Sequence, residues 1–275
     1  MSNSQPNKKN KVYNWLICKQ MCLQDCLSDL MELLLPPRRL FGQMASCLLC
    51  MARCGAQQSV CSDCLASFPT LGLACQKCCE PIVSTATDVL GDDLLCPRCQ
   101  QGKRQFQVCI SALQYIPPVS SMVQKLKYNG RLLYLKPLSV HLLNELDRHY
   151  ADTPWPEALL PVPMHWWKLR KRGFNQAQLI AKILSKETGI SLLSGYVQKL
   201  RTGSSQSRLA AKLRERNIRH SYRVKKTIAL RHIAIVDDVM TTGATIDELC
   251  RVLKKDGVET IDVWCIARTP PVSHI

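Results

Sequence analysis

The sequence predicts an α/β domain with a parallel sheet, preceded by a small module in which cysteines bind metal. Apolar, strand-like runs alternate with helix-like segments along the C-terminal part of the chain, as in parallel sheets that are covered on both faces. Four Cys-x-x-Cys pairs stand close together nearer the N-terminus. We therefore expect a leader at residues 1–46, disordered and then helical, a double metal module at 47–105, and the α/β domain at 106–275.

The leader has apolar residues at helical spacing over residues 13–35, and Pro36 and Pro37 end the pattern. The α/β domain should then begin with a strand, a turn at Pro117 and Pro118, and two helices. The elements expected after these are a strand at 158–164, a basic loop, a helix at 175–189, a polar basic segment at 201–221, a strand at 232–238, a helix at 245–255 and a strand at 260–268.

The four Cys-x-x-Cys pairs predict two structural zinc ions. Each pair can present two thiolates from one tight turn, and two pairs complete a tetrahedral Zn²⁺ site. Sequential pairing needs the shortest loops, so we adopt it, although crossed pairing stays open. Dithiol redox chemistry explains four such pairs poorly, and Cys54 and Cys79 are expected to be extra thiols. The expected zinc ligands are Cys47, Cys50, Cys61, Cys64, Cys75, Cys78, Cys96 and Cys99.

The positive charge of the chain is unevenly distributed. The formal net charge is +16, and seventeen Lys or Arg residues stand against two acidic residues between His165 and His232. Such a concentration attracts polyanions, so we expect a nucleic acid or a small polyphosphate as the partner. A solvated basic surface without a partner stays open as the alternative.

The sequence shows no signal for membrane insertion or secretion. No apolar run approaches the roughly 20 residues that cross a bilayer, and the N-terminal segment lacks the pattern of a signal peptide. We therefore expect a cytoplasmic protein. Cytoplasmic thiols are kept reduced, which favours metal binding over disulfides for the sixteen cysteines.

The strand expected at 232–238 ends in two adjacent carboxylates, Asp237 and Asp238 (the acidic pair). Ligands bind at the carboxyl ends of parallel strands, and two carboxylates there suit the hydroxyl groups of a ribose. The residues that follow can wrap a phosphate with backbone N–H groups, and the next helix directs its positive end at the same anion. We therefore expect a bound ribose phosphate. This phosphate segment consists of Thr241, Thr242, Gly243, Ala244 and Thr245.

Two other interpretations of the acidic pair stay open. Paired aspartates after a strand also form the Mg²⁺ pocket of receiver-type domains, but no phosphate segment directly follows them there. A helix cap would use one aspartate and leave the other without a role. The chain has neither a Walker A motif nor G-x-G-x-x-G after a strand, which excludes those phosphate-binding loops.

The segment IAIVDDVMTTGAT resembles the ribose 5-phosphate motif of type I phosphoribosyltransferases. Together with PVPMHWWKLRKRGFNQAQLIA, QSRLAAKLRERN and the four cysteine pairs, it is similar to the ComF/GntX family, which is linked to competence and to the use of external DNA. The resemblance covers nearly everything from about Leu33 onward. It implies a parallel-sheet, type I phosphoribosyltransferase-like domain preceded by a double zinc ribbon.

The resemblance also implies roles for individual residues. The acidic pair would bind the ribose of phosphoribosyl pyrophosphate (PRPP), the phosphate segment its 5′-phosphate, and Mg²⁺ its diphosphate. Residues 201–219 would form a mobile hood, and Phe174 and Asn175 would set the turn into the next helix. The pyrophosphate-side basic loop would consist of Arg170, Lys171, Arg172 and Gly173.

Enzymatic activity stays open at this stage, because no histidine lies in a catalytic constellation and no pocket for one particular base can be identified. We expect a protein of DNA uptake or utilisation that binds single-stranded DNA and PRPP or a nucleotide, with Trp166 and Trp167 able to stack on bases. The alternative is an active phosphoribosyltransferase of nucleotide salvage. A DNA-uptake helicase or an inner-membrane channel would be further partners and could hold the protein at the inner membrane.

Overall fold

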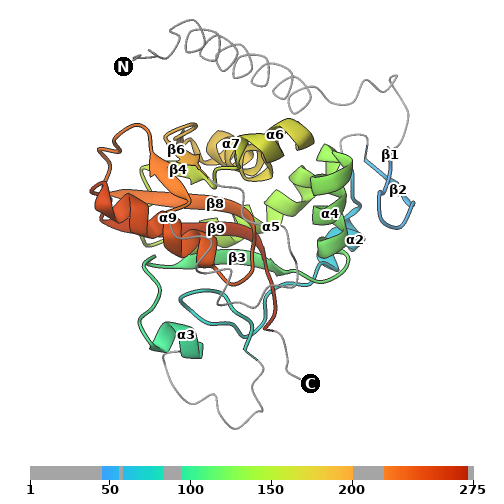
Figure 1. The fold of residues 1–275 in the computed structure, drawn as a ribbon. Helices are drawn as coiled ribbons and strands as arrows, with labels where there is room; N and C mark the ends of the chain where they lie inside the picture. Colours follow the sequence, from blue (N-terminus) through green and yellow to red (C-terminus); the bar gives the residue numbers. More distant parts are fainter. Residues whose placement is uncertain (1–44, 56–57, 83–93, 201–219, 272–275) are drawn as a thin grey trace, which may run out of the picture. The chain divides into compact units, whose positions relative to one another are not determined.

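The computed structural model describes residues 45–55, 58–82, 94–200 and 220–271 (Figure 1). The chain divides into two compact units, with the boundary after Cys61. The helix expected in the leader and the hood expected at 201–219 lie outside the described residues. The domain boundaries expected at 46/47 and 105/106 stay predictions.

The first unit contains a small antiparallel element. Strands β1 (Ala45–Ser46) and β2 (Arg53–Cys54) pair with each other, and the thiol of Cys54 donates a hydrogen bond to the carbonyl oxygen of Ala45 at 3.4 Å. The same sulfur lies 3.4 Å from the carbonyl oxygen of Gln58. Cys54 therefore contacts backbone carbonyls, as an extra thiol would.

The second unit is organised around a five-stranded parallel sheet, in which the strand order is β3-β9-β8-β4-β5 (Figure 1). The central strands β8 and β9 are rich in apolar residues and are buried along most of their length, which is typical of a parallel sheet with both faces covered. The predicted parallel α/β class is confirmed. The strands are β3 (Cys109–Gln114), β4 (Ala158–Pro161), β5 (Ser191–Leu192), β8 (His232–Met240) and β9 (Thr260–Arg268).

Helices cover both faces of this sheet. The helices α5 (Leu135–His149) and α7 (Gln176–Thr188) pack on one face, whereas α9 (Ala244–Lys255) shares a core with Ile233 and Ile235 of β8 on the other. No helix in the described ranges is long and apolar enough to span a membrane. The remaining elements are α2 (Ser62–Ala66), α3 (Pro97–Gln100), α4 (Val119–Asn129), the 3-10 helix η1 (Leu132–Tyr134), α6 (Trp166–Arg172) and the antiparallel pair β6 (Val197–Lys199) and β7 (Tyr222–Val224).

Two local expectations are wrong. The basic loop expected at 170–173 is instead the last turn of helix α6, because His165 caps the start of this helix through Nδ1 and Gly173 ends it at a φ of 86°. The strand expected to end at Asp238 continues to Met240, because its pairing with β9 continues to the Met240–Arg268 pair. The acidic pair therefore lies inside the paired strand rather than at its last two positions.

A buried polar network connects β9 to α5 and β8. The hydroxyl of Tyr150 donates to Oδ2 of Asp262 at 2.7 Å and accepts from the indole N–H of Trp264 at 3.0 Å. Nε2 of His232 lies 2.7 Å from the same carboxylate oxygen. One phenol hydroxyl thus satisfies two buried groups, which makes its removal costly.

Replacing Tyr150 with Phe should lower the free energy of unfolding by about 1–3 kcal/mol, because the indole N–H and the Asp262 carboxylate both lose a partner in a buried site. Urea denaturation measures this change. The matched control is Tyr128→Phe, since Tyr128 is 76% exposed and its change should stay within about 0.5 kcal/mol. Equal effects of both substitutions would contradict the network.

Candidate functional site

The acidic pair lies near the carboxyl end of β8 and is neutralised by a lysine from a distant helix. Nζ of Lys127, on α4, forms an ion pair with Oδ2 of Asp238, which is buried. The backbone N–H of Asp238 donates to Oδ1 of Asp237 at 2.9 Å. The strand and α4 therefore bring two carboxylates and one ammonium group into one small volume.

The two carboxylates are in different electrostatic environments. Burial and the charge of Asp238 raise the pKa of Asp237 well above its ordinary value, and Lys127 only partly opposes this rise. Burial by itself would lower the pKa of Lys127, but the charges of Asp238 and Asp237 outweigh it and raise that pKa. Lys127 consequently stays protonated and acts as the counter-charge of the pair.

The β6–β7 pair adds a second cation and a phenol to this site. Nζ of Lys199 lies 5.1 Å from the ring centroid of Tyr222. Burial and the charge of Lys168 lower the pKa of Lys199, while Asp237 opposes the shift. Burial and the charge of Asp237 raise the pKa of Tyr222, against a hydrogen bond with the side chain of Thr245. Lysines from α4 and β6 thus interact electrostatically with the acidic pair, and Lys168 of α6 acts on Lys199.

The phosphate segment connects β8 to α9 by a tight turn. Gly243 has a φ of 78°, in the left-handed region that favours glycine. A Cβ at this position would lie 2.7 Å from Cε of Met240 and 2.9 Å from Cζ of Arg104, so there is no room for a side chain. In the described chain, no hydrogen bond is donated by the backbone N–H groups of Thr241, Thr242 or Gly243. These N–H groups, at the start of α9, have the chemistry of an anion site.

The predicted zinc ligands form two clusters. The first cluster is Cys47, Cys50, Cys61 and Cys64, and the second cluster is Cys75, Cys78, Cys96 and Cys99; in each, the four sulfur atoms lie within 4.8 Å of one another. The structure thus groups the pairs sequentially. The Cys50–Cys61 and Cys78–Cys96 sulfur separations are both 3.6 Å, close to the roughly 3.8 Å edge of a tetrahedron with Zn–S bonds of about 2.3 Å.

The environment of one sulfur in the first cluster favours the thiolate form, whereas burial raises the pKa of Cys78 and Cys99 in the second cluster. Burial raises the pKa of the Cys47 thiol, but hydrogen bonds from the backbone of Cys50, Cys61 and Leu49 outweigh it and lower that pKa to about 6. The thiolate form, which binds metal, is therefore accessible at neutral pH. Cys79 donates instead to the carbonyl oxygen of Cys109 at 2.9 Å, as an extra thiol outside the second cluster.

The basic residues expected on the pyrophosphate side lie at the end of α6. Arg170 and Lys171 are exposed and Arg172 is half-buried, and Gly173 ends the helix. The amide of Asn175 donates to the carbonyl oxygen of Val162 at 3.0 Å and so ties the turn after α6 to the end of β4. Since β4 and β8 are parallel neighbours, α6 begins at the same edge of the sheet as the acidic pair.

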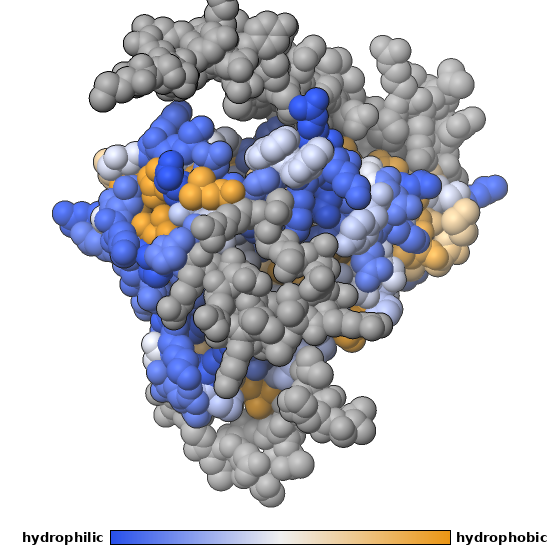
Figure 2. Space-filling model, viewed as in Figure 1, coloured by the Kyte–Doolittle hydropathy of each residue, from blue (hydrophilic) through white to orange (hydrophobic). Residues whose placement is uncertain are grey.

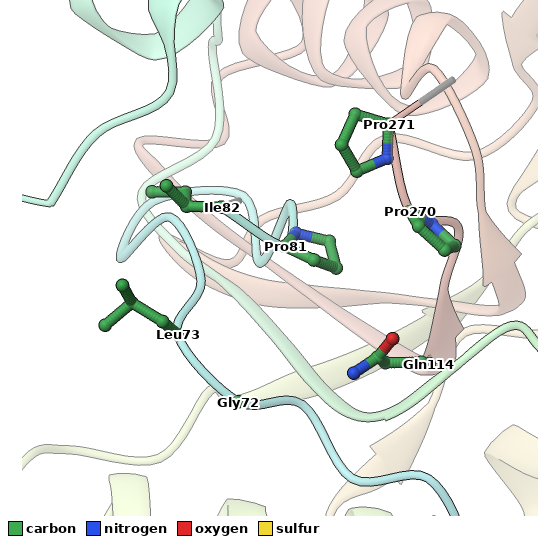
Figure 3. Close-up of a pocket in the computed structure, with 7 residues that line it drawn as sticks. All are labelled: Gly72, Leu73, Pro81, Ile82, Gln114, Pro270 and Pro271. Atoms are coloured by element: carbon green, nitrogen blue, oxygen red, sulfur yellow. The ribbon is translucent and has the colours of Figure 1, made fainter. Parts of the chain in front are cut away.

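An apolar pocket of about 610 Å³ has a different set of lining residues (Figure 3). Pro81 and Ile82 line it from the cysteine module, and Pro270 and Pro271 line it from the chain after β9. None of the residues predicted to bind ligand lines this pocket, and its lining offers no charged group.

Comparison with known proteins places the chain in a family. The family model described as a phosphoribosyl transferase domain matches residues 169–271. A DNA utilization protein YhgH of Salmonella typhi is 32% identical over 230 residues, which cover 81% of this chain and 96% of the relative. The chain belongs to the ComF/GntX family.

Two competence proteins are further relatives of this ComF/GntX chain. Competence protein F of Haemophilus influenzae is 32% identical over 185 residues, or 63% of this chain and 78% of the relative. Competence protein ComFC of Streptococcus pneumoniae is 24% identical over 214 residues, or 76% and 87%. A crystal structure of a purine phosphoribosyltransferase from Pyrococcus horikoshii shares 20% identity and a TM-score of 0.31 over 52% of this chain and 78% of that one.

The site of this ComF/GntX protein thus contains residues that sequence analysis missed. Lys127, Lys199 and Tyr222 interact electrostatically with the acidic pair but lie in elements without a motif. The sequence patterns predict helices and strands in this part of the chain, but they do not indicate which charged residues of these elements face the acidic pair. The ribose, phosphate and pyrophosphate roles of the predicted residues remain predictions at this point.

Replacing Asp237 with Asn should stabilise the protein, and the gain should grow with pH. A pKa raised in the folded state favours the neutral acid, so stability is lost as the pH rises through that pKa, whereas Asn stays neutral. Lys127 keeps Asp238 as its partner in the variant. We expect the melting temperature to rise by about 2–4 °C at about pH 8 and by less at about pH 6.

The control for this variant is Asp147→Asn, on the exposed side of α5, which should leave the melting temperature unchanged at both pH values. Scanning fluorimetry of the metal-loaded protein measures both variants. A loss of stability in the Asp237 variant at the higher pH would contradict the raised pKa of this carboxylate.

Proposed function

We propose that this protein acts in the uptake or utilisation of DNA and binds two ligands: single-stranded DNA on the surface of α6, and PRPP or a nucleotide at the acidic pair and phosphate segment. The names of its relatives support the biological role. The match to a phosphoribosyl transferase domain supports the second ligand. The main structural support for the first ligand is a pair of exposed, stacked tryptophans on a basic helix.

The tryptophan pair has the geometry of a base-stacking platform. Trp166 and Trp167 are 57% and 59% exposed, their ring centroids lie 5.2 Å apart, and their planes differ by 8°. Two large rings left in water on one short helix are unusual for a surface without a partner. Aromatic rings of this kind bind bases of any sequence, because every base has a stacking face.

The surface around the pair supplies charge and a further ring. The guanidinium of Arg172 lies 5.5 Å from the ring centroid of Tyr128, which is the most exposed large hydrophobic residue described. Lys168, Arg170 and Lys171 are exposed on α6 itself. In the view of Figure 2, the surface over α6 is pale to deep blue, which marks hydrophilic residues. Cations of this kind neutralise phosphates of the DNA backbone and make binding depend on salt.

The phosphoribosyl ligand is supported by complementary chemistry at the end of β8. Carboxylates of Asp237 and Asp238 can accept hydrogen bonds from the ribose 2′- and 3′-hydroxyls, and the N–H groups of the phosphate segment can donate to the 5′-phosphate. Lys127 and Lys199 would offset the charge of a diphosphate, with which Mg²⁺ would arrive.

The two cysteine clusters are proposed to bind one structural Zn²⁺ each. Four thiolates in a closed tetrahedral set suit structural zinc and leave no open position for a substrate. The metal would replace a hydrophobic core in segments this short, so its binding energy would be folding energy.

Binding of a short single-stranded oligonucleotide should weaken about tenfold or more in Trp166→Ala with Trp167→Ala, because stacking contributes about 1–3 kcal/mol per base. Fluorescence anisotropy against salt concentration measures the affinity and its slope.

Lys171→Gln should flatten the salt slope by about one phosphate contact. The matched control is Lys255→Gln at the C-terminal end of α9, which should leave the slope unchanged. Unaltered affinity in the double tryptophan variant would reject this surface.

Replacing both Asp237 and Asp238 with Ala should abolish PRPP binding in isothermal titration, because the ribose hydroxyls lose their acceptors. The zinc content should stay at two ions per chain, which shows that the clusters are intact. Unchanged PRPP affinity would reject the ribose assignment. Release of pyrophosphate from PRPP in the presence of nucleobases would instead favour the phosphoribosyltransferase of nucleotide salvage.

A further inference from the structure

Three arginines hold the backbone of the phosphate segment and the end of β8 from behind. The guanidinium of Arg104 donates to the carbonyl oxygen of Thr242 at 2.8 Å, and that of Arg98 donates to the same oxygen at 2.9 Å. The guanidinium of Arg268 donates to the carbonyl oxygens of Met240, at 2.9 Å, and of Thr241. Three consecutive carbonyl groups are thus fixed by cationic donors, whose hydrogen bonds are stronger than those of neutral donors.

Each of these arginines also belongs to, or contacts, the chain of the second cluster. Arg98 lies between two of its cysteines on the short helix α3, and Arg104 follows this helix closely. Nε of Arg268, at the end of β9, donates to the carbonyl oxygen of Cys78 at 3.0 Å, and Nη2 of the same residue donates to Glu80 at 2.7 Å. The second cluster and the phosphate segment are therefore connected through single side chains.

Burial leaves these side chains little freedom. The side chains of Arg104 and Arg268 are each 1% exposed. Arg104 also forms an ion pair with Asp247 of α9 at 2.6 Å, and its guanidinium occupies the space in which a side chain at Gly243 would lie. The sulfurs of the second cluster share one core with Ile246 and Leu249 of α9. A shift of the cluster would therefore move the arginines, and the arginines would move the segment.

The charge of a metal-loaded second cluster would also couple the cluster to the arginines. Four thiolates around one Zn²⁺ leave a net charge of about −2, which buried guanidinium groups can neutralise. Without the metal, four sulfurs at these separations would either repel one another or become protonated, so we expect the compact geometry of the cluster to depend on the metal.

We propose that Arg98, Arg104 and Arg268 are positioning residues through which metal in the second cluster sets the shape of the phosphate segment and so its affinity for a phosphoribosyl ligand. The affinity part rests on the proposed function, whereas the shape part does not. Coupling between two sites is reciprocal, so a ligand at the phosphate segment must tighten zinc binding at the second cluster by the same factor. The hydrogen bonds of the three arginines given above reach the phosphate segment, the end of β8 and the chain of the second cluster, so the first cluster serves as an internal control.

The shape part is tested without any ligand. Amide hydrogen exchange at Asp247, whose N–H donates to the carbonyl oxygen of Gly243 at 2.9 Å, should be about tenfold faster in zinc-loaded Arg104→Met than in the wild-type protein, and Arg104→Lys should restore part of the protection. Exchange in α7, on the opposite face of the sheet, should not change. Arg53→Met, an exposed arginine near the first cluster, is the matched control. Wild-type exchange at Asp247 in Arg104→Met would overturn the proposal.

The affinity part is tested by zinc release to a chelator, with and without ribose 5-phosphate. The ligand should slow one of the two release phases by about 5-fold or more in the wild-type protein, leave the other phase unchanged, and have no effect in Arg104→Met. If the wild-type protein binds ribose 5-phosphate but neither zinc-release phase changes its rate, the proposed coupling is wrong. If the wild-type protein binds neither ribose 5-phosphate nor PRPP, the proposed function fails, and hydrogen exchange alone decides whether the arginines shape the segment.

Discussion

The cationic anchoring of the β8–α9 connection is the constraint on which the site depends. Arg104, Arg98 and Arg268 bind the carbonyl oxygens of three successive residues, so the backbone of this connection is oriented without a bound anion. With the carbonyl groups engaged from behind, the N–H groups at the start of α9 remain for an anion. A segment ordered in advance loses little entropy on binding, which favours affinity. The need for glycine at residue 243 follows from the same packing.

The second constraint is charge balance around the acidic pair. Burial would make two adjacent carboxylates costly, and Lys127 offsets this cost from α4. Lysines of α6 and β6 extend the positive field over the same region, so a ligand that offers both hydroxyls and phosphates matches the site better than a purely acidic or purely basic one. Because α6 starts at the carboxyl end of β4, beside β8, the tryptophan pair and the acidic pair belong to the same edge of the sheet.

Sequence patterns predicted the strands and helices with strong apolar periodicity, and the spacing of the cysteine pairs predicted the sequential grouping of the two clusters. They missed α6, since a run rich in tryptophan and arginine has no apolar face and its helix depends on a histidine cap. They also missed Lys127 and the three arginines. A lysine or arginine that pairs with a residue more than a hundred positions away leaves no local signal, because only the tertiary fold brings the partners together. The roles of residues 241–245 came from resemblance and from local backbone chemistry.

The most direct test of the anchored phosphate segment is a crystal structure of the zinc-loaded protein with ribose 5-phosphate and Mg²⁺. We expect the phosphate against the N–H groups of residues 241–245, the pentose hydroxyls against Asp237 and Asp238, and the three arginines still bound to the carbonyl oxygens behind the segment. A phosphate bound elsewhere, or a segment that releases its arginines when the ligand enters, would contradict this view of the site.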